Sequence, residues 1–443
     1  MPALLLAASG AVRRSSGIRG EPHNAALVRT GAEPGHTARR AAARWRRETI
    51  GHPGPVTDLV AGPAAAPRLF TPSMVRLLAV SFGSLASLYL LLPVVPLYVA
   101  TSGAGDVGAG AATGVMMLST VLAELAVPRL LARHGYRAAL VLGPLLLGGG
   151  AAATAASPGL GLVLAACAAR GAGLAVVVVA GPVLAAELAP PERQGEALGL
   201  YGAAVGLPAV ACLPLGLWLS LRFGYAPAML AGAVPALLAL AAVPGLPARR
   251  GERTGPRTGV LRGLADGGLA RPAVVFAALT VAAGVLLTFL PLAVPARSRG
   301  IAAVALLVHA CTMPLARWAA GRYGDRRGPA GLLVPSVLVA AVGMAGLVWL
   351  REPYAVVAGA AVFGAGFGAA QNVTLALMFR RAPRSGLGRV SALWNLAYDG
   401  GMGVGAAGFG LVAGPAGYAG GFALTAALLF AALGPAWFDG RRR

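Results

Sequence analysis

Long apolar runs, separated by short polar stretches, occupy most of the chain between Met74 and Phe438. Each run is close to the roughly 20 residues that an α-helix needs to cross the hydrocarbon core of a bilayer. The pattern predicts an all-α membrane protein with twelve transmembrane helices. The predicted spans cover residues 74–99, 109–131, 137–157, 159–187, 197–220, 226–246, 272–295, 300–320, 329–349, 353–379, 390–413 and 417–438.

The two halves of the chain resemble each other when one is shifted by 193 residues (328 − 135 = 193). The shift aligns Arg133 and Gly135 with Arg326 and Gly328, Arg170–Gly173 with Phe363–Gly366, Ala189-Pro190 with Ala382-Pro383, and Gly224–Ala226 with Gly417–Ala419. One constant offset over four separated motifs predicts two six-helix halves in parallel orientation, which is the internal symmetry of many transporters.

The span pattern divides the chain into five predicted parts. A disordered, basic N-terminal extension covers residues 1–72, and six-helix halves cover residues 73–246 and 272–438. A central loop over residues 247–271 joins the halves, and a basic tail covers residues 439–443. The extension is rich in Arg, Ala, Gly and Pro, and the alternative is that translation starts at Met74, which would leave the extension outside the protein.

Composition supports a membrane protein and excludes several other classes. The mean hydropathy is +0.73, and the net charge of +22 comes from 37 basic residues, all of them arginine. The arginines occupy short loops and form no basic domain, so we expect the lipid bilayer and no nucleic acid as a partner. The three cysteines lie inside apolar runs, where neither a disulfide nor a metal site is expected. We expect no cofactor.

Arginine asymmetry predicts the orientation of the chain. The loops after spans two, four, six, eight and ten, together with the C-terminus, hold roughly twenty arginines, and the opposite loops hold four. The positive-inside rule therefore predicts that both termini and the central loop are cytoplasmic. We expect a multi-pass protein of the cell membrane that acts as a monomer.

The densest charge cluster of the apolar part is GRYGDRRG, Gly321–Gly328. Its residues Gly321, Asp325, Arg326 and Gly328 match the Gly-x-x-x-Asp-Arg-x-Gly motif that members of the major facilitator superfamily carry after spans two and eight. The first-half copy keeps Arg133 and Gly135 but lacks the acid.

From about Met74 to its end, the chain resembles a member of that superfamily. The segment Ala186–Ala203 resembles the loop before span five of efflux-type members, whereas Gly202–Ala209 only approximates the Gly-Pro signature of antiporters. The resemblance implies a twelve-helix transporter fold.

The motif suggests a conformational latch on the cytoplasmic side. Asp325 beside arginines can hold an ion pair and cap the N-terminus of a neighbouring helix. Under the two-fold repeat that neighbour is span five, so we expect the latch to join the halves when the transporter faces outward. The alternative is that the arginines only determine topology.

Charged residues inside a bilayer are costly and mark functional sites. Glu124, Arg170 and Asp399 are the candidates for proton coupling, with Glu124 placed to interact with Arg170 and Asp399 replacing a glycine at the repeat-equivalent position. The alternative for Asp399 is a structural hydrogen bond to Asn372 or Asn395. The candidates for a substrate cavity are His309, Gln371, Asn372, Trp394, Asn395 and Tyr398.

These features predict a secondary active transporter that exports a small amphiphilic molecule or drug in exchange for protons. Proton-coupled uptake of a sugar or another nutrient is an alternative that needs a more polar cavity. A non-transporting sensor on a transporter fold is another, because the first-half motif is degenerate. An enzyme is not expected, because no loop carries a His/Asp/Glu cluster, a nucleophile motif or a P-loop.

Overall fold

The computed structural model describes residues 69–156, 159–250, 267–383 and 386–441. Every regular element within these ranges is helical. Most of the predicted N-terminal extension and of the central loop lies outside the described residues. The prediction of an all-α protein is confirmed for the part of the chain that the structure describes.

The first half begins with a capped helix. The Oγ1 atom of Thr71 accepts a hydrogen bond from the backbone N–H of Met74 at 3.2 Å, and Pro72 occupies the first helical position, where no N–H is needed. The first helix is interrupted at Pro93. The elements of this half are α3 (Pro72–Leu91), α4 (Val94–Val99), the π-helical turn Ala100–Ala104, α5 (Gly105–Ala156), α6 (Leu160–Leu188), α7 (Gln194–Phe223), α8 (Tyr225–Ala239) and a 3-10 segment (Leu240–Gly245).

The second half repeats much of this order. Its elements are α10 (Gly267–Ala293), α11 (Arg299–Arg327), a 3-10 turn (Ala330–Leu332), α12 (Leu333–Gly346), α13 (Pro353–Arg381), α14 (Leu387–Ala431) and α15 (Leu433–Arg441). Helix α10 begins five residues before the predicted span (272 − 267 = 5), and α15 runs to Arg441, past the predicted end at 438. That last helix is held by Asp439, which is 3% exposed and pairs with Arg381 at 2.8 Å.

Four glycines with positive φ mark equivalent turns. Gly135 (φ 80°, ψ 171°) interrupts α5, and Gly328 (φ 84°, ψ 149°) ends α11; Gly224 (φ 89°, ψ 173°) and Gly417 (φ 67°, ψ 167°) form the other pair. Only glycine adopts this backbone region without strain. Each pair is 193 residues apart (328 − 135 and 417 − 224), as are the two ends of α6 and α13 (353 − 160 and 381 − 188).

Eight helical segments in the described ranges are long and apolar enough to cross a membrane. The first, Pro72–Ala156, has 85 residues and the last, Arg389–Asp439, has 51, far above the roughly 20 that one crossing needs. Ala330–Gly346, inside the predicted ninth span, is a shorter apolar helix.

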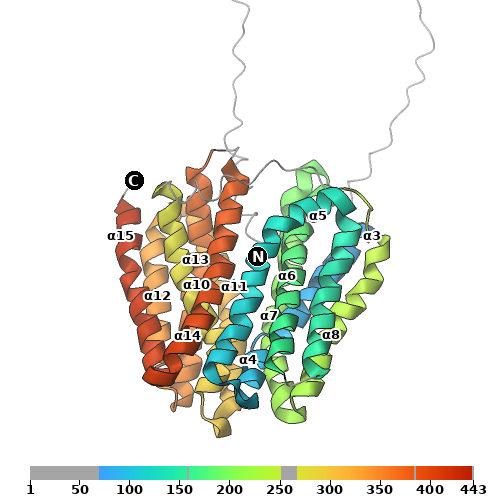
Figure 1. Ribbon diagram of the computed structural model, residues 1–443. Helices are drawn as coiled ribbons and strands as arrows, with labels where there is room; N and C mark the ends of the chain where they lie inside the picture. The colour runs from blue at the N-terminus through green and yellow to red at the C-terminus, as the bar shows by residue number, and fades with distance from the viewer. Residues whose placement is uncertain (1–68, 157–158, 251–266, 384–385, 442–443) are drawn as a thin grey trace, which may run out of the picture. The chain divides into compact units, whose positions relative to one another are not determined.

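The helices pack mainly within each half. Helix α5 packs most extensively on α6, and α11 on α13, whereas α5 with α14 and α7 with α11 form the main contacts between the halves. Figure 1 shows α3 to α8 on one side and α10 to α15 on the other, with α14 beside the first part of α5. The two halves therefore meet along α5 and α7 of the first half and along α11 and α14 of the second.

Candidate functional site

A central pocket lies between the two halves. It is lined by residues of α3, α5, α6 and α7 from the first half and of α10 and α14 from the second, with Leu92 between α3 and α4. Its empty space is about 560 Å³, including the part open to solvent. Nine of the twelve lining side chains are Leu, Val or Met, so the pocket suits an apolar molecule.

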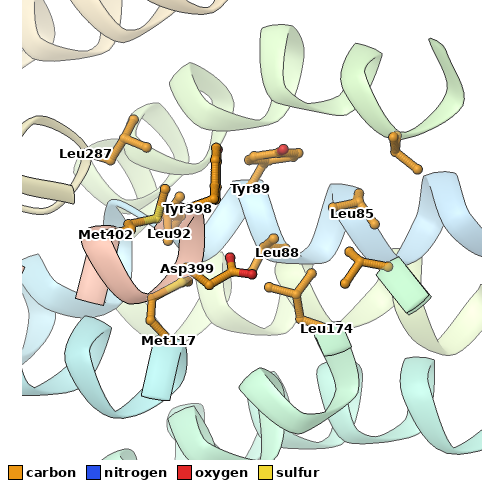
Figure 2. Close-up of a pocket in the computed structure, with 12 residues that line it drawn as sticks. Leu85, Leu88, Tyr89, Leu92, Met117, Leu174, Leu287, Tyr398, Asp399 and Met402 are labelled. Atoms are coloured by element: carbon orange, nitrogen blue, oxygen red, sulfur yellow. The ribbon is translucent and has the colours of Figure 1, made fainter. Parts of the chain in front are cut away.

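The polar groups of the pocket are Tyr89, Tyr398 and Asp399. Figure 2 shows the carboxyl group of Asp399 pointing into the pocket toward Leu88 and Leu174. Asp399 is 3% exposed, and its Oδ2 atom has no hydrogen-bond partner among the described residues. An acid at the centre of a membrane helix raises the free energy of membrane insertion by about 2.5–3.5 kcal/mol, so an acid in this position indicates a functional site.

Arg317 of α11 belongs to the same polar region, although the sequence analysis did not identify it. Its Nη1 atom donates to Oε1 of Gln371 at 3.1 Å, and its charge acts on the hydroxyl groups of Tyr89 and Tyr398. One signal in the sequence could have found it: the 193-residue offset places Arg317 on Glu124 (317 − 193 = 124), so two opposite charges occupy equivalent positions. Tyr89, which lines the pocket, is a second residue that the sequence analysis did not identify.

The other two coupling candidates lie outside the central pocket. Glu124 is buried in α5 and acts electrostatically on Asp399. Arg170 is 1% exposed, and its Nη2 atom donates to the backbone carbonyl of Ser87 at 3.5 Å. The predicted pairing of Glu124 with Arg170 is absent among the described ion pairs.

The six cavity candidates divide into two groups. Tyr398 lines the pocket, and the ring of Trp394 stacks on the ring of Tyr398 with centroids 5.8 Å apart. The Nε1 atom of Trp394 donates to Oγ1 of Thr374 at 3.3 Å. The remaining four do not line it: His309 stacks on Phe363, Gln371 accepts from Arg317, Asn372 lies beside Gly321, and Asn395 is half-buried on α14. The hydrogen bond from Asn372 or Asn395 to Asp399, which is the alternative role for this acid, is absent among the hydrogen bonds of the described residues.

The cluster Gly321–Gly328 covers the end of α11 and the glycine that terminates it. Its acid, Asp325, is unpaired among the described residues. Asp325 and Arg326 are exposed, and Asp325 makes no hydrogen bond or ion pair with a described residue. At the start of α7, Arg193 pairs instead with Glu196 at 2.6 Å, and no side chain caps the helix. Arg133 is also exposed. The contact expected between Asp325 and the start of α7 is therefore not made by the described residues in this conformation.

The halves meet closely at the opposite end. A Cβ atom at Gly110 would lie 2.5 Å from the carbonyl oxygen of Ala406, and one at Gly410 would lie 2.6 Å from that of Asp106. Two hydrogen bonds add to this contact: Tyr418 donates to Asp106 at 2.5 Å, and Thr288 donates to Thr113 at 3.1 Å. The close backbone approach depends on glycine. We call this contact between α5 and the second half the closed end.

We expect Tyr418→Phe to weaken the closed end without unfolding the protein. The change removes one hydrogen bond to a carboxylate, which contributes about 1.5–3 kcal/mol, but keeps the ring that stacks on Phe409. Cysteine-labelling rates at this end should rise, while Tyr354→Phe, at a tyrosine that is 87% exposed, should leave them unchanged. Equal labelling of Tyr418→Phe and the parent protein would contradict a role for this bond.

The fold is similar to that of solved transporters. The nucleoside transporter NupG superposes with a TM-score of 0.69 at 10% identity, covering 84% of this chain and 100% of that one. The xylose transporter XylE from E. coli, in a partially occluded inward-open conformation, gives 0.64 at 14%, covering 83% and 97%. A single-residue variant of the E. coli fucose:proton symporter FucP gives 0.57 at 15%, covering 84% and 99%.

No curated protein matches this chain in sequence. A comparison with protein-family models does give a match, and it agrees with the structural similarity. The family model described as the Major Facilitator Superfamily matches residues 77–406, from α3 to the first part of α14, and this range includes every residue of the central pocket. This multi-pass membrane protein, with its apolar pocket between two groups of helices, belongs to the Major Facilitator Superfamily.

Proposed function

We propose that the protein is a secondary active transporter that exports a small amphiphilic molecule in exchange for protons by alternating access. One observation carries the proposal: a buried carboxyl group, that of Asp399, points into an otherwise apolar pocket between the halves, and its Oδ2 atom has no hydrogen-bond partner among the described residues. A group in this position can exchange a proton for a ligand when access to the pocket alternates.

The lining favours an organic cation with an apolar body as the substrate. Leucine, valine and methionine side chains solvate the body, Tyr89 and Tyr398 offer ring faces, and Asp399 supplies the counter-charge. The proton and the cation then compete for one carboxylate, so release of one accompanies binding of the other. Arg317, close enough to act on both tyrosines, favours departure of the proton when it approaches Asp399.

We further propose twelve spans in two parallel repeats. The 193-residue offset between the turns at Gly135 and Gly328, and between α6 and α13, supports this arrangement. The 85- and 51-residue segments accommodate the additional crossings. The arginine-rich ends of the helices are then cytoplasmic, together with both termini, and the protein acts as a monomer in the cell membrane.

On this orientation the structure represents a state that faces the cytoplasm. The closed end carries Asp106 and Tyr418 and lies on the outer side, and the latch residue Asp325 is unpaired, among the described residues, on the inner side. Similarity to the inward-open XylE structure supports this assignment.

Nutrient uptake is the second candidate. The similar structures include transporters of nucleosides, xylose, fucose and peptides, as their names state. The predominantly apolar lining disfavours a polar sugar, because its hydroxyl groups would lack partners. A sensor would bind the ligand without moving it.

Everted membrane vesicles containing the full chain test these alternatives together. The probe is tetraphenylphosphonium, a permanent cation with an apolar body, and xylose serves as the polar comparison. We expect accumulation of the cation only when the vesicle lumen is acid, and its loss when the pH gradient is dissipated. Gradient-driven movement of xylose alone would support uptake, and saturable cation binding without accumulation would support a sensor.

We expect Asp325→Asn to slow transport while leaving the amount of folded protein unchanged. The amide keeps the shape but removes the charge that stabilises the latched, outward-facing state. Because Asp325 is exposed and unpaired among the described residues, the inward-facing state loses nothing. Initial rates in the vesicle assay measure the effect. Asp106→Asn is the comparison variant: it weakens the closed end and therefore shifts the conformational equilibrium toward the outward-facing state, whereas Asp325→Asn shifts it away from that state. Parent-like rates for Asp325→Asn would reduce the motif to a topology signal.

A further inference from the structure

A second pocket adjoins the central one inside the first half. It lies between α4, α5 and α6, and Leu92 lines both pockets. Its empty space is about 180 Å³, including the part open to solvent, and most of its lining is aliphatic or methionine. Its polar lining residues are Arg170, Thr113 and Cys167. The proposed export mechanism does not use this pocket.

The guanidinium group of Arg170 has few acceptors for its five N–H donors. Its Nη2 atom donates to the carbonyl of Ser87, at 3.5 Å, and Nε has no partner among the described residues. The ion pairs of the described chain, Arg193–Glu196 and Arg381–Asp439, lie elsewhere. A charge that is 1% exposed inside a membrane helix needs an opposite charge or several hydrogen bonds.

The polar groups beside Arg170 are hydrogen-bond donors. Thr113 accepts from Thr288 at 3.1 Å, which leaves its own O–H free to donate. Cys167, three residues before Arg170 on α6, carries a weak S–H donor and lines the same pocket. None of the nine lining side chains is a carboxylate or an amide. Donors gathered around one cation, with no carboxylate or amide among them, complement an anion.

We propose that this pocket binds a single small monovalent anion of the size of chloride. The limited space excludes a bulky organic anion, and the apolar remainder of the lining disfavours strongly hydrated divalent anions such as sulfate. The anion accepts from Arg170 Nε and from the hydroxyl of Thr113, and it neutralises the guanidinium charge. Binding here is independent of the proposed transport, because neither Asp399 nor a proton gradient takes part.

The test uses purified full-length protein in detergent, with sodium chloride replacing sodium gluconate at constant ionic strength. We expect a saturable rise of the thermal unfolding midpoint with chloride or bromide and none with gluconate, whose anion is too large. Arg170→Gln should abolish the rise. The matched control is Arg222→Gln, which removes an equal charge at a surface position over Phe223 and should keep the response.

Two further measurements decide the question even if Arg170→Gln does not fold. Thr113→Val removes the proposed donor to the anion, together with the acceptor of the Thr288 hydrogen bond, and should raise the half-saturating chloride concentration roughly 2- to 10-fold. The ³⁵Cl NMR line of chloride should broaden with the parent protein and sharpen again when bromide is added. Equal unfolding midpoints in chloride and gluconate, broadening that bromide does not reverse, or an unchanged chloride response in Thr113→Val would overturn the proposal. Failure of the vesicle transport assay would not affect it.

Discussion

Asp399→Asn is expected to reduce pH-gradient-driven export to background while leaving substrate exchange without a gradient measurable. The amide mimics a permanently protonated carboxyl group and cannot release a proton to water when a cation binds. Since the Oδ2 atom has no hydrogen-bond partner among the described residues, the substitution breaks no described bond and should leave the fold intact.

The measurement compares gradient-driven uptake into everted vesicles with exchange of labelled tetraphenylphosphonium across proteoliposomes at equal pH. Asn395→Asp is the matched control: it adds an acid one turn away on α14, at a half-buried position outside the pocket lining, and should not restore coupling to Asp399→Asn. Full gradient dependence in Asp399→Asn would show that another group carries the proton, with Glu124 the next candidate because it acts on Asp399.

Gly410→Val is expected to prevent closure of the closed end. A Cβ atom there would lie 2.6 Å from the backbone oxygen of Asp106, and backbone cannot move aside as a flexible side chain can. Overpacking of this kind costs about 1–3 kcal/mol, which corresponds to a roughly 5- to 150-fold shift of the conformational equilibrium toward the outward-facing state. Transport should fall accordingly, because the cycle needs both states.

Spin labels at Val107 and Leu411, both exposed near the closed end, report the shift as a longer distance between α5 and α14. The matched control is Gly408→Val on the same helix, where a Cβ atom has no neighbour within 4 Å. We expect its distance distribution and transport to equal those of the parent. A short distance retained in Gly410→Val, or an equal shift in both variants, would contradict the role assigned to this contact.

The sequence predicted the helices well where apolar runs are bounded by proline or glycine. The span predicted over 159–187 is α6 (Leu160–Leu188), and the one predicted over 353–379 is α13 (Pro353–Arg381). Length and hydropathy suffice there, because a lipid-facing helix must satisfy its own backbone hydrogen bonds. The seventh predicted span starts at residue 272, five residues after α10 begins at Gly267 (272 − 267 = 5).

The site was harder to predict than the helices, because the face that a residue presents depends on how the helices are rotated in the bundle. Asp399 and Tyr398 line the central pocket, whereas His309 and Asn372 lie on α11 and α13 facing other contacts. Arg317 lies only four residues before the motif glycine Gly321, where sequence alone suggests a membrane-surface arginine. The proposed latch involving Asp325 concerns one conformational state, and no sequence pattern specifies the state.

Proton release on substrate binding tests the central claim most directly. Purified protein in weakly buffered, slightly acid solution is mixed with tetraphenylphosphonium, and a soluble pH indicator records the protons set free. The proposal predicts close to one proton per bound cation for the parent protein and none for Asp399→Asn. Saturable cation binding by the parent protein without proton release would contradict the claim that the two ligands compete for this carboxylate.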